Sequence, residues 1–323
     1  MVYSCNDRTV PTSYATPIHR ENPHPAELFS IAITMLPQST PLPSPPDRDD
    51  NAHKGTFGHL LLIAGSVSMS GAARLSGTAA LRGGVGLLTI ATPRSALPIV
   101  AAENPAWMTL PLDESEGNCV ATAVDQIEAA WQRKAAVALG PGLGQTDGVV
   151  EVVRQTYADC PLPMVLDADG LNAFAKHTDA LKTRADDAPR VLTPHPGELA
   201  RLLGTGVGDV QNDRQRVATV FAAAHKIVLV LKGPGTIITD GQRTVVNTTG
   251  NSGMARGGSG DILTGLIAAL LAQGMSAFDA AHLATHLHGL AGDIAAEKFT
   301  KQAMLVTDLL DCLPEAWRTI DKP

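Results

Sequence analysis

The sequence is poor in aromatic residues and in paired cysteines, and each deficit excludes a class of protein. Phe, Trp and Tyr make up 4% of the 323 residues, so a large apolar core has to be built from Ala, Val, Leu and Ile. The four cysteines lie far apart without a CxxC pair, at Cys5, Cys119, Cys160 and Cys312. This spacing argues against a disulfide framework or a zinc site and favours reduced thiols in the cytoplasm.

Basic clusters and long apolar runs are missing too. The formal net charge is -7 and no Lys/Arg run occurs, so nucleic acid is not expected as a partner. No apolar run approaches the roughly 18 residues that a membrane span needs. The first residues are Pro-rich and include Asp7, Arg8, Arg20 and Glu21, which does not fit a signal peptide. We expect a soluble cytoplasmic protein without membrane contact.

Proline is concentrated near the N-terminus. Nine of the 22 prolines lie in the first 46 residues, and this stretch ends in PLPSPPDRDD (Pro41–Asp50). Such a composition predicts a mostly disordered arm over residues 1–50, with a short helix around Ala26–Leu36. No second domain and no internal repeat is evident after it, so we predict one domain over residues 51–323.

Short apolar runs alternate with helical patterns throughout this domain. Ser70–Arg82 and Gly260–Gln273 are predicted helices. The predicted strands, of which the last two form a hairpin, are His59–Ala64, Gly86–Ala91, Ala135–Leu139, Pro163–Leu166, Val191–Leu192, Ile227–Leu231, Thr236–Thr239 and Thr244–Asn247. The alternation predicts an α/β fold with a mostly parallel central sheet covered by helices on both faces.

Five glycine-rich or polar turns occupy positions where ligands bind in open parallel sheets. In GNSGMARGGSGD (Gly250–Asp261), glycines let backbone N–H groups approach one oxyanion at a helix N-terminus. Asp261 is then placed to take a proton from an attacking hydroxyl, the alternative being a plain helix cap.

In KGPGT (Lys232–Thr236), the lysine indicates a nucleotide phosphate contact, the alternative being a solvated turn. A Walker A loop is excluded, because the chain has no Gly-Lys dipeptide.

The other three turns are TPHPGE (Thr193–Glu198), GPGLG (Gly140–Gly144) and DADGLN (Asp167–Asn172). Two prolines fix the backbone around His195, which suits the positioning of a substrate, although a stiff surface turn has the same pattern. GPGLG offers backbone N–H groups. Asp167 and Asp169 could hold Mg²⁺ through water. Taken alone, the last two patterns are equally typical of ordinary turns.

Three histidines near the C-terminus, His282, His286 and His288, are interpreted as structural. The first two share a helix face, but nothing nearby completes a set of metal ligands.

Taken together and in order, the five turns resemble those of one family. The sequence is similar to the ADP/ATP-dependent NAD(P)H-hydrate dehydratases, carbohydrate-kinase-like relatives of ribokinase. The similarity runs from about Lys54 to the end and includes HLLLIAGSVSMSGAARLSGTAALRGGVGLLTIATP, GPGLG, VLDADGLNAF, TPHPGELARLLG, VLKGPGTIITDG and GNSGMARGGSGDILTGLIAALLAQG. It implies a ribokinase-like three-layer α/β/α fold and a homotetramer. It also implies dehydration of (6S)-NADHX or NADPHX to NADH or NADPH, with Mg²⁺ and with ADP as phosphoryl donor.

The resemblance also implies roles for the turn residues. Asp261 would be the base that activates the C6 hydroxyl of the hydrate, which attacks the terminal phosphoryl group before phosphate is eliminated and AMP released. The implied nucleotide contacts are Lys232, Gly233, Pro234, Gly235, Thr236, Gly257, Gly258, Ser259 and Gly260. The implied substrate contacts are Asp261, His195, one of Ala72 and Ala73, and a glycine of Gly140–Gly144, with Gly142 and Gly144 as candidates.

Two features depart from the family pattern. Ser252 stands where the family usually has proline, which predicts a less rigid loop. About 50 residues precede the matching region. They are too few for the epimerase domain of many bacterial relatives, so we expect a separate protein to interconvert the R and S hydrates.

Two other functions remain open at this point. A small-molecule kinase of the same superfamily, acting on a vitamin precursor or a sugar, would have counterparts of TPHPGE and KGPGT and would make a stable phosphate ester. A nucleotide-binding regulatory protein without turnover would not need Asp261.

Overall fold

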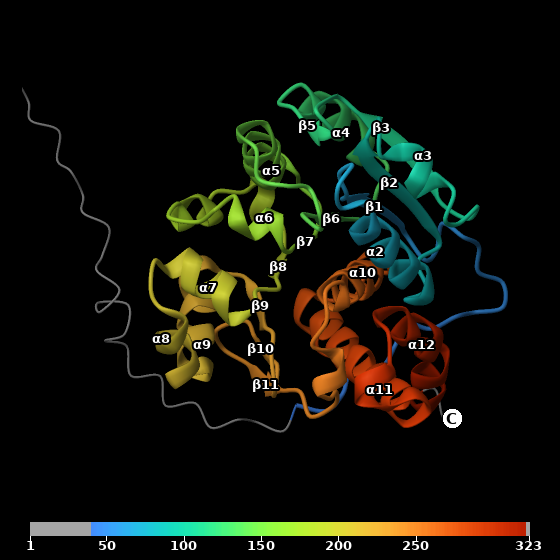
Figure 1. Ribbon diagram of the computed structural model, residues 1–323, viewed down its shortest axis with the longest axis vertical. Helices are drawn as coiled ribbons and strands as arrows, with labels where there is room; N and C mark the ends of the chain where they lie inside the picture. The colour runs from blue at the N-terminus through green and yellow to red at the C-terminus, as the bar shows by residue number, and fades with distance from the viewer. Residues whose placement is uncertain (1–39, 321–323) are drawn as a thin grey trace, which may run out of the picture. The chain divides into compact units, whose positions relative to one another are not determined.

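The computed structural model describes residues 40–320. A nine-stranded sheet crosses the domain in the order β11-β10-β9-β8-β7-β6-β1-β2-β3 (Figure 1). Seven strands pair in parallel, and the hairpin β10–β11 joins β9 in the antiparallel direction. The strands are β1 (His59–Ile63), β2 (Leu87–Pro93), β3 (Met108–Leu112), β6 (Ala136–Leu139), β7 (Met164–Leu166), β8 (Arg190–Leu192), β9 (Val228–Leu231), β10 (Ile237–Thr239) and β11 (Thr244–Val246).

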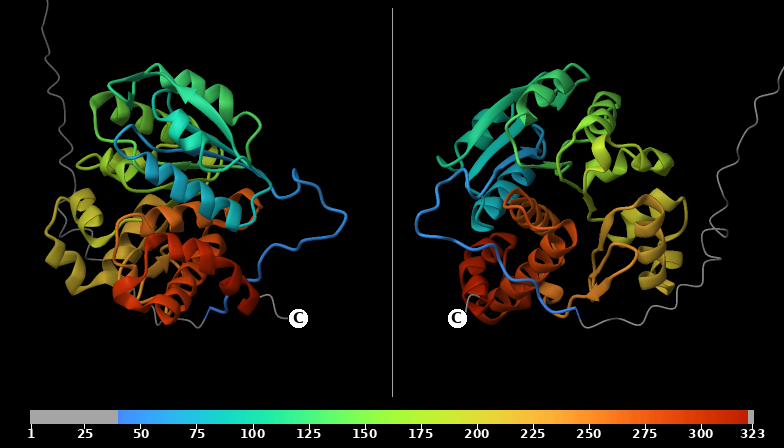
Figure 2. Two further views of the ribbon diagram at one scale, coloured as in Figure 1. Left: turned by 45° about the vertical axis from the view of Figure 1, so that its right-hand side comes forward. Right: turned by 180° about the vertical axis from the view of Figure 1, so that it is seen from behind.

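Helices cover both faces of this sheet. Helices α2, α10, α11 and α12 lie on one side, and α4, α5 and α9 lie on the other (Figures 1 and 2). The predicted three-layer α/β/α fold is therefore confirmed. The helices are α2 (Ser70–Arg82), α3 (Leu97–Ala101), α4 (Ala123–Trp131), α5 (Asp147–Asp159), α6 (Asp169–Asn172), α7 (Pro196–Leu203), α8 (Val207–Asn212), α9 (Arg214–His225), α10 (Ser259–Ala272), α11 (Ala277–Ala303) and α12 (Val306–Ile320).

Small residues let α10 pack closely along α2. A Cβ on Gly265 of α10 would overlap the carbonyl oxygen of Ser76 on α2, so only glycine fits there. Ile262 and Leu266 of α10 are fully buried in the aliphatic core between helix and sheet. Near the start of α10, Gly258 lies against Leu75 of α2. The two helices therefore run in the same direction, and both begin at the carboxyl edge of the parallel strands.

The sequence pattern located eight of the nine strands of the main sheet and two of the helices, but not the edge of the sheet. The predicted helix Ser70–Arg82 is observed with those bounds, and the second predicted helix begins and ends one residue earlier than predicted. Every predicted strand is present with ends within two residues. β3 was not predicted, because it contains Pro111 and exposes Met108. Proline is tolerated there because β3 is an edge strand. The short hairpin of β4 (Glu114–Ser115) and β5 (Asn118–Cys119) was also not predicted.

The end of the predicted arm touches the domain. Residues 40–49 contain no helix or strand, but Arg48 donates a hydrogen bond to the Gly84 carbonyl oxygen. Its guanidinium also lies 3.9 Å from the centroid of the Phe57 ring. The helix predicted around Ala26–Leu36 lies outside the described residues, and the division at residue 50 stays a prediction. In the part of the chain described, no helix has the length and apolar character to cross a bilayer.

Candidate active site

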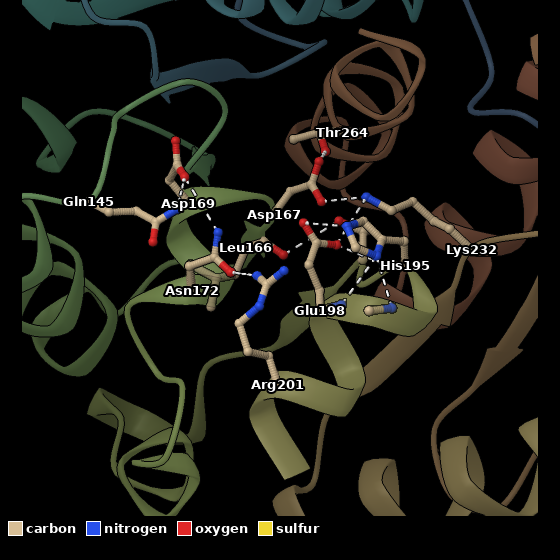
Figure 3. Close-up of polar contacts among 12 residues, drawn as sticks. Gln145, Leu166, Asp167, Asp169, Asn172, His195, Glu198, Arg201, Lys232 and Thr264 are labelled. Atoms are coloured by element: carbon tan, nitrogen blue, oxygen red, sulfur yellow. Dashed lines mark hydrogen bonds and ion pairs between the residues drawn. The ribbon is translucent and has the colours of Figure 1, made fainter. Parts of the chain in front are cut away.

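The five predicted turns meet at the carboxyl edge of the parallel strands. Gly140–Gly144 follows β6, Asp167–Asn172 follows β7, Thr193–Glu198 follows β8 and Lys232–Thr236 follows β9. The fifth turn, Gly250–Asp261, leads into α10. Polar side chains from three of these turns and from Thr264 of α10 face one another (Figure 3), so residues far apart in the sequence form one site.

Asp167, directly after β7, links β9 and α10 through its carboxylate. Oδ1 accepts a hydrogen bond from Lys232 Nζ at 2.8 Å, and Oδ2 accepts one from Thr264 Oγ1 at 2.8 Å (Figure 3). The Asp167 side chain is 1% exposed and that of Lys232 is 19% exposed. Glu198 Oε2 lies 3.7 Å from the same Nζ. Burial disfavours the ammonium, but the attraction of Asp167 and Glu198 outweighs it and raises the pKa of Lys232. Lys232 is therefore charged at neutral pH.

Asp169 braces the glycine turn that follows β6. Its Oδ2 accepts a hydrogen bond from the Gly144 N–H at 2.9 Å, and its Oδ1 accepts one from Gln145 Nε2 at 3.1 Å. Asp167 and Asp169 thus each have protein donors on both oxygens, which fits the predicted water-mediated contact to Mg²⁺ better than direct coordination. Within residues 40–320 no three His, Cys, Asp or Glu side chains are grouped to hold a metal.

His195 caps α7 and is held in one tautomer. Its Nδ1 accepts hydrogen bonds from the N–H groups of Gly197 at 3.0 Å and Glu198 at 3.2 Å. In return, Glu198 Oε2 accepts a hydrogen bond from the His195 N–H at 2.7 Å, which completes a capping box. Because Nδ1 is an acceptor, the proton of the neutral ring is on Nε2. The ring is half-exposed and Nε2 lies 3.6 Å from Glu198 Oε1, beyond hydrogen-bond distance, so this N–H is open to a ligand.

The glycine run before α10 leaves a helix N-terminus beside Lys232. Gly258 is the N-cap, with φ of 93° and no side-chain cap, so backbone N–H groups of the first turn are in position to bind an anion. A Cβ on Gly260 would lie 3.1 Å from Lys232 Nζ; glycine therefore lets the helix approach the lysine. The Ser259 hydroxyl is buried, with Oγ 3.2 Å from His288 Nε2, and its backbone N–H donates to the Arg256 carbonyl at 3.3 Å, so Ser259 holds the turn in place.

Asp261 follows in the first turn of α10. Burial and the negative charge of Asp167 raise the pKa of Asp261 from 3.8 to about 7, against the opposing effect of Lys232. Among the described residues none donates a hydrogen bond to its carboxylate. A carboxylate with unoccupied oxygens and a pKa near neutrality can take a proton from a substrate hydroxyl at pH 7.

The structure separates the two alanines that the sequence left as alternatives. Ala73 is fully buried, and its Cβ packs against Gly65, so its side chain offers no surface to a ligand. Ala72 is half-buried, and its Cβ lies 2.8 Å from where a Cβ on Gly142 would be. Gly142 has φ of 65° and is itself buried, whereas Gly144 is partly exposed. Ala72 and Gly144 therefore offer surface at this end of the site.

Arg214, at the start of α9, holds the lysine loop in place and was not indicated by any motif. Its guanidinium donates hydrogen bonds to the carbonyl oxygens of Leu231 and Lys232, each at 3.2 Å, and to that of Pro234. The turn Gly233, Pro234 and Gly235 is exposed, and Thr236 Oγ1 closes it by donating to the Gly233 carbonyl at 2.9 Å. The loop that was predicted to contact nucleotide is thus exposed to solvent, and Arg214 holds its backbone in place.

The loop around Ser252 is fastened without the proline that relatives usually have. Asn251 Nδ2 donates to the Gly292 carbonyl at 2.9 Å and to Asp293 Oδ1 at 3.0 Å, and Asp293 Oδ2 accepts from the Gly250 N–H at 2.8 Å. Residues Ser252–Met254 form a 3₁₀ turn. These contacts attach the loop to α11, and the less rigid loop expected from Ser252 stays a prediction.

The three histidines of α11 are at least partly buried. Burial lowers the pKa of each, that of His288 to about 4, so all three are neutral at pH 7. His288 supports Ser259, as described above, and the His282 ring packs edge-on to Phe278 with centroids 6.4 Å apart.

Comparison with known proteins identifies the family. A family profile described as NAD(P)H-hydrate dehydratase matches residues 60–315. The chain is 43% identical over 282 residues to the bifunctional NAD(P)H-hydrate repair enzyme of Moorella thermoacetica. This alignment covers 86% of the chain and 52% of that protein. The chain thus spans about half the length of this relative.

Two comparisons with Bacillus subtilis cover nearly the whole relative. The chain is 37% identical over 282 residues to its ADP-dependent (S)-NAD(P)H-hydrate dehydratase, covering 85% of the chain and 95% of that protein. The crystal structure of the B. subtilis ADP/ATP-dependent NAD(P)H-hydrate dehydratase, co-crystallised with ATP and Mg²⁺, superposes with a TM-score of 0.76 at 36% identity. The superposition covers 86% of this chain and 95% of the B. subtilis chain. On these matches, the chain belongs to the NAD(P)H-hydrate dehydratase family of ribokinase-like proteins.

Proposed function

We propose that this chain catalyses the ADP-dependent dehydration of (6S)-NADHX and NADPHX to NADH and NADPH. The observation that carries the proposal is the position of Asp261 beside a helix N-terminus and Lys232, as a partly buried carboxylate to which no residue of 40–320 donates a hydrogen bond. Binding alone would not need a free carboxylate next to an anion site. Membership of the family and the name of the B. subtilis relative, an ADP-dependent dehydratase, support ADP as the donor.

The chemistry converts a poor leaving group into a good one. Asp261 takes the proton of the C6 hydroxyl while the hydroxyl oxygen bonds to the β-phosphorus of ADP. The bond from that phosphorus to the bridging oxygen breaks, which releases AMP. The C6–O bond then breaks and a proton leaves C5, which releases phosphate and restores the C5–C6 double bond. One hydrate and one ADP thus yield one reduced nicotinamide, one AMP, one phosphate and one proton. The protein contributes mainly positioning and charge stabilisation.

The residues of the site divide between the two substrates. Lys232 and the backbone of Gly257–Gly260 neutralise the transferring phosphoryl group, and the exposed loop Gly233–Thr236 contacts the rest of the nucleotide. The Nε2–H of His195 and the surface at Ala72 and Gly144 contact the hydrate. Asp261 lies between the two groups and reaches the hydroxyl.

Mg²⁺ would neutralise nucleotide phosphates when bound. The residues present fit it in an indirect role, because the oxygens of Asp167 and Asp169 already have protein donors. A cation with few protein ligands that enters with the phosphates matches the usual behaviour of Mg²⁺.

The direct test mixes the protein with NADHX, Mg²⁺ and either ADP or ATP, and follows absorbance in the reduced-nicotinamide band. We expect the absorbance to rise with ADP, and AMP and phosphate to appear in equal amounts. Formation of a phosphate ester without a rise in absorbance would mean that the chain stops at the kinase step. No product with either nucleotide would contradict the proposal.

Assembly, location and partners are inferred from the family resemblance. We propose a cytoplasmic homotetramer that works with an NAD(P)HX epimerase activity. The bifunctional name of the Moorella relative supports a second activity beside the dehydratase. Light scattering on the purified chain checks the tetramer.

The pKa of Asp261 predicts how the rate depends on pH. The carboxylate is the active base, and its pKa is raised to about 7, so kcat/KM should fall about tenfold per unit below pH 7 and level off above it. Initial rates with both substrates below saturation check this, with tryptophan fluorescence as the control for folding. An unchanged rate down to pH 5 would mean that this carboxyl titrates near its ordinary value of 3.8.

A further inference from the structure

We infer that Thr264 is a positioning residue for phosphoryl transfer, acting through Asp167 on Lys232. The inference rests on the proposed function for the identity of the reaction. No role was predicted for Thr264, which lies in the apolar run of α10 beyond the glycine loop and Asp261. Its side chain is fully buried, and its hydroxyl donates the 2.8 Å hydrogen bond to Asp167 Oδ2 (Figure 3).

The place of Thr264 on the helix connects this bond to the anion site. Thr264 is four residues after Gly260, so both lie on the same face of α10. A Cβ on Gly260 would lie 3.1 Å from Lys232 Nζ and 3.6 Å from Asp167 Oδ2. This face of the helix therefore packs on the Asp167–Lys232 pair. Within residues 40–320, the Thr264 hydroxyl makes the only hydrogen bond from α10 to the Asp167 carboxylate.

The hydrogen bond divides the oxygens of Asp167 between two donors. Thr264 occupies Oδ2, so Lys232 is held at Oδ1. An ammonium has three N–H donors. One binds Asp167, Glu198 at 3.7 Å attracts the second, and the third remains for a phosphate. Without the Thr264 hydroxyl, Oδ2 would be buried without a donor. The carboxylate would then draw the Lys232 ammonium toward both oxygens and away from the nucleotide.

The expected consequence of losing this hydroxyl is slower turnover and weaker ADP binding, with little change in the binding of NADHX. Thr264→Val removes the hydroxyl and keeps the shape of the side chain. We expect it to lower kcat and the affinity for ADP by about tenfold each, the size of effect typical of a hydrogen bond to a charged group. KM for NADHX should stay within about twofold of the wild-type value. Thr264→Ser retains the hydroxyl and should recover most of the lost activity.

A matched control separates this effect from the loss of any buried hydroxyl in a helix. Thr285 of α11 is 3% exposed and donates only to the Ala281 carbonyl of its own helix, at 2.7 Å. We therefore compare Thr264→Val, Thr264→Ser and Thr285→Val by steady-state kinetics, by calorimetric titration with ADP and Mg²⁺, and by thermal melting. Thr264→Ala replaces the valine variant if that variant melts below the assay temperature.

Three results would overturn the inference. They are an equal effect of Thr264→Val and Thr285→Val, a failure of Thr264→Ser to recover activity, and a parallel rise of KM for both substrates. A wild-type chain that binds ADP without forming NADH would contradict the proposed function alone. The ADP affinities of the variants would then still decide the role of Thr264.

Discussion

Asp261→Asn should lower the rate of NADH formation by about 10²–10⁴-fold, the usual contribution of a general base. The carboxamide has nearly the shape of the carboxylate but cannot accept the proton of the C6 hydroxyl. ADP binding should persist, because the anion site is built from backbone N–H groups and Lys232. Stopped-flow absorbance at saturating ADP and NADHX measures the loss, and calorimetry measures ADP affinity. A variant that retains more than a tenth of wild-type kcat would assign the proton to another acceptor.

The same variant should be more stable than the wild type, which distinguishes lost chemistry from lost folding. The folded-state pKa of Asp261 is about 7, above its ordinary 3.8. The folded protein therefore binds this proton more tightly than the unfolded chain, and stability is lost as pH rises through this window. Asparagine does not ionise, so Asp261→Asn should melt at a higher temperature at pH 8. The control is Asp125→Asn, an exposed carboxylate in the first turn of α4, which should leave both rate and melting temperature nearly unchanged.

Lys232→Met should impair both catalysis and folding. Turnover should fall by about 10²–10³-fold, because the transferring phosphoryl group loses a preorganised positive charge. The variant also leaves Asp167, 1% exposed, without its ion-pair partner. Breaking one side of a buried pair costs about 3–5 kcal/mol of unfolding free energy. Urea unfolding at pH 7 measures this cost.

The double variant Lys232→Met/Asp167→Asn separates the two effects. Removing both charges should restore much of the stability but none of the turnover, because the phosphoryl group still lacks its cation. The matched control is Lys182→Met, which breaks an exposed pair with Asp179 and should change stability far less because water screens that pair. Recovery of turnover in the double variant would show that Lys232 acts only by neutralising Asp167.

Local patterns located the chemical groups but not their partners. The alternation of apolar residues defined the strands, and the glycines before Asp261 marked an anion site, because both signals lie within a few adjacent residues. Thr264 and Asp167 are 97 residues apart, and Arg214 precedes the carbonyls it holds by 17 to 20 residues. No local pattern reports such contacts. Ala72 and Ala73 are neighbours of the same type, so only their burial separates them.

By itself, the sequence determined the α/β class, the order of the turns, the family resemblance and Asp261 as the proposed general base. These properties follow from periodicity and from residue types at short spacing. Only the tertiary structure decided which groups the base meets. The pKa of Asp261 is raised by its burial and by Asp167, and Lys232 is held at one oxygen of Asp167 because Thr264 occupies the other. Burial and charge act through distance in space, and the fold alone sets that distance.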